Sequence, residues 1–243
     1  MTKLSVNVNK IATLRNTRSI GIPSVMKFSK IALDAGANGI TVHPRPDQRH
    51  IRPADVYEIS KLVHEYPDAE FNIEGNPFLE FEKYIRDVRP HQCTLVPDSN
   101  EQSTSDHGWD LSKDFDRLKP VVARLKGYGS RVSLFMDPIP DAMNRAQELG
   151  VDRIEFYTAP YAHGFAVGNS GAVNTFVSAA ERAIELKLGI NAGHDLNLEN
   201  LPPFLKAVPG VLEVSIGHAL IGDALEFGLA ETVRKYLAAC RPS

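Results

Sequence analysis

Short apolar runs rich in β-branched residues alternate along this chain with longer segments of helical periodicity. The apolar runs cover residues 4–8, 39–43, 70–73, 92–96, 131–135, 153–157, 189–192 and 213–216. The helical segments cover residues 23–35, 53–66, 77–88, 111–126, 140–149, 171–186, 201–207 and 222–239. Eight strands alternating with eight helices predict an α/β fold, a (β/α)8 or TIM barrel, as a single domain over residues 1–243. A doubly wound open sheet is the alternative, but it does not require eight strands.

Polar side chains interrupt the predicted strands at alternate positions, whereas parallel strands buried on both faces are usually continuous in apolar residues. Each polar set shares one face of its strand: Asn7 and Asn9, Thr41 and His43, Asn72 and Glu74, Ser133, Glu155, Asn191 and Ser215. In a barrel that face is the interior. Buried Glu and His are seldom kept without a partner or a function. We therefore expect a catalytic mouth rather than only a hydrogen-bonded polar core.

Three connections that follow predicted strands are longer than plain turns. Residues 12–22 carry Arg15 and Arg18, residues 98–110 are polar and look like a lid, and residues 158–170 hold several glycines. All three lie on the face where barrels place their active sites.

Residues 43–52 form a strongly basic loop on a chain whose net charge is only -3. The loop contains His43, Arg45, Arg49, His50 and Arg52. Arginine forks match phosphate oxygens, so we expect an anionic substrate beside a histidine that transfers protons. The alternative is a solvated basic turn before a helix.

Two Gly-His pairs follow the last two predicted strands, Gly193-His194 and Gly217-His218. Glycine lets the backbone approach a ligand, and barrels frequently bind phosphate with the loops after strands seven and eight. One pair is a weak signal, but two at matching positions are moderately specific. His43, Glu74 and His194 then lie on three strand ends around one cavity, where they can act as acids and bases.

Composition narrows the class of protein further. The chain has 43% hydrophobic residues, enough for a full core, and its mild acidity argues against a nucleic-acid partner. We find no secretory signal, no apolar stretch near the ~20 residues of a membrane helix, and only two cysteines. We therefore expect a cytoplasmic protein that has no membrane or nucleic-acid partner.

Metal-free chemistry is favoured, with no cofactor. No short ligand spacing such as His-x-His is present, and Arg45 beside His43 would oppose a divalent cation. Nucleotide-binding loops and a nucleophile elbow are also missing. A metal-dependent hydrolase and a phosphate-ligand sensor that lacks catalysis remain the alternatives.

Six segments together resemble the pyridoxine 5′-phosphate synthase family, in the same order and spacing from residue 4 to about 230. They are residues 7–18, 39–52, 72–74, 93–97, 191–194 and 216–222. The resemblance implies a barrel that joins 1-deoxy-D-xylulose 5-phosphate to 3-amino-2-oxopropyl phosphate. The products would be pyridoxine 5′-phosphate, phosphate and water, in the last step of deoxyxylulose-dependent vitamin B6 synthesis. The family needs no metal or organic cofactor and forms ring-shaped homo-octamers.

The same resemblance implies roles for individual residues. His43, Glu74 and His194 would transfer protons, and Glu155 would stabilise charge in the transition state. The amino-ketone phosphate would be bound by Asn7, Arg18, Gly217 and His218. The pentulose phosphate would be bound by Arg45, His50 and Thr104.

The chain departs from the family pattern at two places. Many members carry Asp-His where this chain has Asn9-Lys10, and glycine where it has Asp195. We expect Asn9 to recognise the pentulose hydroxyls and Lys10 to attract its phosphate, although Lys10 in a surface salt bridge would be worth little. Asp195 is expected to alter one backbone contact to phosphate.

Overall fold

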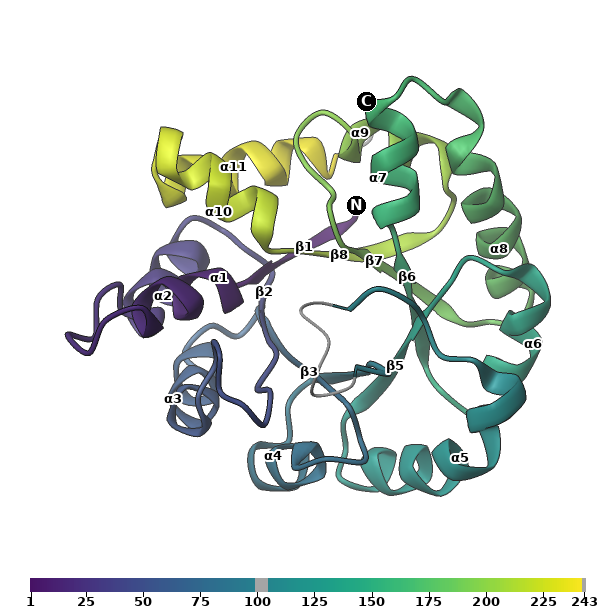
Figure 1. Cartoon of the computed structure of the whole chain (residues 1–243), viewed down its shortest axis with the longest axis horizontal. Helices are drawn as coiled ribbons and strands as arrows, with labels where there is room; N and C mark the ends of the chain where they lie inside the picture. Colours follow the sequence, from purple (N-terminus) through teal and green to yellow (C-terminus); the bar gives the residue numbers. More distant parts are fainter. Residues whose placement is uncertain (99–104, 242–243) are drawn as a thin grey trace.

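The computed structural model describes residues 1–98 and 105–241, which form a closed barrel of eight parallel strands (Figure 1). Its strands are β1 (Lys3–Asn7), β2 (Gly39–Val42), β3 (Glu70–Gly75), β4 (Gln92–Leu95), β5 (Arg131–Met136), β6 (Arg153–Tyr157), β7 (Gly189–Gly193) and β8 (Val211–Ile216). Each strand pairs with the next along the chain, and β8 pairs with β1 to close the barrel. The predicted (β/α)8 barrel is therefore confirmed.

Helices surround the barrel on its outside (Figure 1). They are α1 (Asn9–Asn16), α2 (Val25–Asp34), α3 (Pro53–Val63), α4 (Phe81–Val88), α5 (Leu111–Gly127), α6 (Pro140–Leu149), α7 (Ala159–Ala166), α8 (Asn174–Glu185), α9 (Leu201–Ala207), α10 (His218–Phe227) and α11 (Leu229–Ala239), with a 3-10 turn η1 (Ser170–Val173). Every predicted helical segment contains a helix. None of the helices in the described ranges is long and apolar enough to cross a membrane.

Two of the connections that we expected to be loops contain helices of their own. Helix α1 occupies the start of the first one, and its buried face includes Arg15 beside Ile11 and Ala12, so its apolar pattern is weak. Helix α7 carries Pro160 and Gly164, both poor helix formers. The last predicted helix is two helices, because Gly228 adopts a φ of 76° and ends α10.

Polar side chains fill the middle of the barrel, as their alternation along the strands predicted. Thr94 Oγ1 donates to Asn72 Oδ1 at 3.1 Å and approaches Glu155 Oε2 at 3.5 Å, so β3, β4 and β6 are linked across the interior. Ser5 and Thr41 hydroxyls lie 2.6 Å apart and extend this network to β1 and β2. The apolar side chains between these positions point outward and are buried under the helices.

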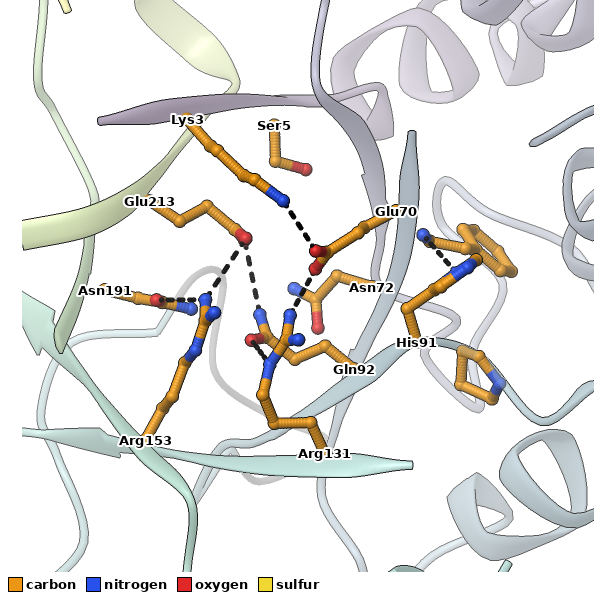
Figure 2. A network of polar contacts seen from close by, with 12 residues as sticks. Lys3, Ser5, Glu70, Asn72, His91, Gln92, Arg131, Arg153, Asn191 and Glu213 are labelled. Atoms are coloured by element: carbon orange, nitrogen blue, oxygen red, sulfur yellow. Dashed lines mark hydrogen bonds and ion pairs between the residues drawn. The ribbon is translucent and has the colours of Figure 1, made fainter. Parts of the chain in front are cut away.

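The amino-terminal end of the barrel is closed by ion pairs rather than by apolar side chains (Figure 2). Glu70 pairs with both Lys3 and Arg131, and Glu213 pairs with Arg153 at 3.5 Å. Gln92 connects the two groups by accepting from Arg131 Nε at 3.0 Å and donating to Glu213 at 3.3 Å. In barrels this end serves stability, and active sites lie at the opposite end.

Candidate active site

A cavity of about 390 Å³ opens at the carboxyl ends of the strands. Most of the residues that we predicted for the site line it: Asn7, Asn9, Lys10, His43, Arg45, His50, Glu74, Glu155, His194, Asp195, Gly217 and His218. Arg18 is exposed and lies outside this lining. Thr104 lies outside the described residues. Residues in or directly after β1, β2, β3, β6, β7 and β8 thus meet in one space.

His43 and Glu74 form the centre of one wall, and both are oriented from the end of β1. His43 Nδ1 lies 4.0 Å from Glu74 Oε2. Asn7 Nδ2 donates to the same carboxylate oxygen at 3.4 Å, and Asn9 Oδ1 accepts the His43 amide proton at 2.9 Å. Asn7 Oδ1 in turn accepts from the Asn9 amide at 3.0 Å. This arrangement places a carboxyl group and an imidazole within reach of one substrate atom.

The surroundings shift the proton affinities of this pair in opposite directions. Burial, followed by the charges of Glu155 and Asp98, raises the pKa of Glu74 well above its ordinary value. Burial, followed by His50 and Arg45, lowers the pKa of His43 well below its ordinary value. The site therefore favours the protonated form of the Glu74 carboxyl and the neutral form of the His43 imidazole. Two groups whose environments separate their roles in this way suit general acid and general base chemistry.

Glu155 lies in the barrel interior, and its place depends on the glycine at the end of β7. Its side chain is 3% exposed, and burial, followed by the charge of Glu213, raises its pKa. A Cβ on Gly193 would lie 2.8 Å from Glu155 Oε1 and 3.0 Å from the Ser215 carbonyl oxygen. Only a glycine leaves room for the carboxyl group at this point of the strand.

His194 follows β7 in a backbone conformation that is rare outside glycine. Its φ is 86°, and that of Asp195 is 57°, a left-handed conformation that costs roughly 1–2 kcal/mol per residue. The imidazole ring lies 5.3 Å from the ring of Tyr157 and 6.0 Å from that of Phe135. Burial lowers the pKa of His194, so its ring is a neutral proton acceptor near pH 7.

Arg45 belongs to the basic loop after β2, and a buried carboxylate holds it. Its Nη1 donates to Asp98 Oδ2 at 2.9 Å, and Ser105 Oγ donates to the same oxygen at 2.9 Å. Arg45 and Asp98 are only 5% and 4% exposed. The guanidinium is thus fixed at the cavity wall before any phosphate arrives.

His50 offers the cavity a neutral hydrogen-bond donor. Its Nδ1 accepts the Ile51 amide proton at 2.9 Å, so the neutral ring carries its proton on Nε2. Burial, followed by the charges of Arg45 and Lys10, lowers the pKa of His50 to about 4. His50 can therefore bind a phosphate oxygen without adding positive charge.

The basic loop is anchored from behind by α1 and α3. Arg15 pairs with Asp55 at 2.5 Å and also donates to the His50 carbonyl oxygen at 3.1 Å. Asn16 Nδ2 donates to that carbonyl at 2.7 Å, and Asp55 Oδ2 accepts from the Arg52 amide. Arg15 thus supports the loop, a role that its sequence position alone does not distinguish from that of a ligand.

Several residues of the cavity lining were not predicted from the sequence, among them Asp98, Ser105, Phe135 and Tyr157. Asp98, Phe135 and Tyr157 come at or just after the ends of β4, β5 and β6, a position that could have marked them. The two aromatic residues looked like core instead. Asp98 belongs to the predicted lid, whose Trp109 is buried and donates its Nε1–H to the Leu95 carbonyl.

Groups that attract anions stand on both sides of β1. Arg45, Arg49 and His50 follow β2, whereas Gly217 and His218 open α10 after β8. The first amides of a helix lack partners within the helix and attract phosphate. Within residues 1–98 and 105–241, no group of three or more His, Cys, Asp or Glu is placed to hold a metal ion.

Comparison with solved structures supports the fold. A tryptophan synthase from M. tuberculosis superposes with a TM-score of 0.67 at 11% identity, over 100% of this chain and 93% of the other. The 4-hydroxy-2-oxoglutarate aldolase/2-deydro-3-deoxyphosphogluconate aldolase from TTHB1 superposes with a TM-score of 0.62 at 15% identity, over 98% and 94%. At such low identity these similarities show the barrel alone.

Sequence comparison is more specific. A pyridoxine 5′-phosphate synthase of Albidiferax ferrireducens is 53% identical over 97% of this chain and 96% of its own length. Proteins of the same name from Xanthomonas oryzae pv. oryzae and Christiangramia forsetii are 53% and 52% identical, over 100% and 98% of this chain and 98% of each relative. A family model described as "Pyridoxal phosphate biosynthesis protein PdxJ" matches residues 4–242. The chain therefore belongs to the PdxJ family of pyridoxal phosphate biosynthesis proteins.

Proposed function

We propose that this chain is a pyridoxine 5′-phosphate synthase. It condenses 1-deoxy-D-xylulose 5-phosphate with 3-amino-2-oxopropyl phosphate and releases pyridoxine 5′-phosphate, phosphate and water. Relatives that carry this name and cover nearly the whole chain support the proposal. The observation that carries it is one cavity that joins the His43–Glu74 pair to anion-binding groups on both sides of β1.

Each substrate phosphate has its own set of partners in this proposal. The pentulose phosphate binds the fork of Arg45, the Nε2–H of His50 and the charge of Lys10, together with Thr104. The amino-ketone phosphate binds the amides at the start of α10, at Gly217 and His218. Asn7 and Asn9 offer amide groups to substrate oxygens between the two sets. Asp195 stands at the rim, where many relatives carry glycine.

Arg18 is the one proposed ligand that the described structure leaves outside the cavity lining. Its contribution in this proposal is attraction of the anionic substrates over a distance, rather than a direct contact.

The proton transfers follow from the pKa directions. The neutral imidazole of His43 accepts a proton as the amine attacks the ketone, and the protonated Glu74 gives one to the departing water. His194 provides a second acid–base group from β7. Glu155 is protonated in its buried setting, but a positive charge that develops on the substrate lowers its pKa. Its proton then passes to the neutral imidazole of His194 in the same cavity, and its carboxylate neutralises the charge on the substrate. The reaction proceeds with neither a metal nor an organic cofactor.

The cellular location and the oligomeric state of the enzyme are also inferred from its family. We place it in the cytoplasm as a homo-octamer in which residues 1–243 act as one catalytic domain, with no nucleic-acid or membrane partner. The exposed Leu225 and Phe227 on α10 offer apolar surface for an interface between copies.

Phosphate release tests the proposal against its alternatives. Purified chain should release phosphate only when both substrates are present, and each substrate alone should give none. A phosphate-ligand sensor would bind either substrate, as measured by isothermal titration, and release nothing from the pair. A metal-dependent hydrolase would contain stoichiometric metal on elemental analysis and release phosphate from a single substrate.

A further inference from the structure

The turn that carries His194 is held by contacts from outside the cavity. His194 and Asp195 are consecutive residues with positive φ, a combination that side chains other than glycine rarely adopt. The direction of the His194 ring depends on this turn, because the residue stands directly after the last residue of β7. Something in the surrounding structure must stabilise the turn.

Thr158 provides the first of these contacts. It precedes α7 and is fully buried, yet its hydroxyl makes no capping bond to that helix. The hydroxyl lies 2.7 Å from the Gly193 carbonyl oxygen and 2.5 Å from that of His194. The Thr158 amide also donates to the Gly193 carbonyl at 3.0 Å. Both donors of this residue thus serve the turn, although Thr158 does not line the cavity.

Asn200 holds the next carbonyl along the turn. Its side chain is 1% exposed, and its Nδ2 donates to the Asp195 carbonyl oxygen at 3.1 Å. Its Oδ1 accepts from the Asn197 amide at 2.8 Å, and its own carbonyl accepts from the Tyr161 hydroxyl at 2.8 Å. Three consecutive carbonyl groups are therefore contacted by two buried side chains, which directly precede α7 and α9.

We infer that Thr158 is the positioning residue of His194. Its hydroxyl stabilises the left-handed turn and so directs the imidazole into the cavity beside Tyr157 and Phe135. The catalytic part of this inference rests on the proposed function, because it takes His194 as an acid–base group. The structural part, the direction of the ring, does not depend on that function.

Three variants test the inference through turnover. Thr158→Val keeps the shape of the side chain but removes the donor, and we expect kcat to fall by about 10- to 100-fold, as small misplacements of reacting groups do. The Michaelis constants of both substrates should change little. Thr158→Ser keeps the hydroxyl and should restore kcat. Thr232→Val is the matched control, because Thr232 in α11 is equally buried and donates to the carbonyl of Gly228, outside the cavity lining.

Nuclear magnetic resonance measures the environment of the His194 ring directly. In protein labelled at histidine, the His194 ring resonances, assigned with His194→Gln, should move in Thr158→Val and stay in place in Thr232→Val. The pKa of His194 should rise toward its ordinary value as the loosened ring gains solvent. Thr158→Ala serves both measurements where Thr158→Val does not fold.

Unchanged kcat together with unchanged His194 resonances in a folded Thr158 variant without the hydroxyl would overturn the inference. Equal losses in Thr158→Val and Thr158→Ser would also overturn it, because the hydroxyl would then not be the cause. If the wild type makes no product, the proposed function fails, but the resonance shifts still decide the positioning role.

Discussion

The acid–base chemistry that we propose for this cavity depends on single residues whose surroundings set their charge. Burial and nearby carboxylates raise the pKa of Glu74, whereas burial and nearby cations lower the pKa of His43. The 4.0 Å between them lets one substrate atom reach both groups. These shifts favour Glu74 as the proton donor of the pair and His43 as the proton acceptor.

Glu74→Gln tests that pair. The amide keeps the shape of the side chain but cannot exchange a proton, so kcat should fall by about 10²–10⁴-fold. Glu58→Gln, at an exposed position on α3, is the control and should keep wild-type turnover. Saturating turnover of Glu74→Gln near the wild-type rate would falsify a proton-transfer role for Glu74.

The neutral state of His50 leads to a prediction about pH. Because burial lowers its pKa to about 4, His50 is neutral throughout the range from pH 6 to 8 and loses no charge there. His50→Ala should weaken binding of the pentulose phosphate by about two- to tenfold, the value of one hydrogen bond. The ratio of the variant and wild-type dissociation constants should stay level over that range, since the titration of the substrate phosphate cancels in the ratio. A ratio that falls as the pH rises through 6.5 would mean that His50 binds as a cation.

Lys10 departs from the family pattern, so its role has to be inferred from its own position and charge. It lines the cavity, and its charge contributes to the lowered pKa values of both His50 and His194 after the larger effect of burial. Lys10→Ala should weaken pentulose phosphate binding by about two- to fivefold at low salt and flatten its salt dependence. Isothermal titration at two salt concentrations measures both effects, with Lys61→Ala on α3 as the control. Equal affinities of wild type and Lys10→Ala at both salt concentrations would leave Asn9 as the only substrate contact of this pair.

The strands position the proposed catalytic groups, and glycine decides how closely these groups approach one another. Gly193→Ala should displace Glu155, because the new Cβ would meet its carboxylate and the backbone of β8. We expect lost turnover and a free energy of unfolding lower by about 1–3 kcal/mol, the usual cost of overpacking. Gly127→Ala at the end of α5 has open space around it and is the matched control. Denaturant unfolding and turnover of the two variants decide the point, and equal behaviour would contradict the steric explanation.

The eight strands could be predicted because each is a short apolar run bounded by polar residues or glycine. Helix α1 could not, because its buried face includes Arg15, whose partner Asp55 lies 40 residues away in the sequence. The break at Gly228 was also hidden, since α10 and α11 both continue the same helical periodicity. The tertiary structure decides which distant residues pair and where the backbone turns. Neither feature leaves much trace in the local pattern of hydrophobic and polar residues.

The lining of the cavity could be predicted where polar residues lie at strand ends, as with His43, Glu74 and His194. Asp98 was missed because a carboxylate in a polar segment looks like solvent-exposed surface until its bond to Arg45 is seen. The same holds for Thr158, whose hydroxyl reaches the end of β7 only in the folded barrel. Supporting residues are thus harder to find than the groups that they support.

Considered as a whole, the molecule separates stability from chemistry at the two ends of one barrel. At the amino-terminal end, the charges of Lys3, Glu70, Arg131, Arg153 and Glu213 are satisfied by one another (Figure 2). At the other end, the cavity brings cations and titratable groups together at the strand ends. Because of this division, the titratable groups at the carboxyl-terminal end can have shifted pKa values while the ion pairs at the amino-terminal end keep the barrel closed.

The most direct measurement is a single turnover of chelator-treated enzyme with both substrates in slight deficit, with the products identified by mass spectrometry. We predict pyridoxine 5′-phosphate and free phosphate in equal amounts from the wild-type chain, and much slower formation of both with Glu74→Gln. No pyridoxine 5′-phosphate from the wild type, or its appearance only after a divalent metal is added back, would contradict the proposed chemistry.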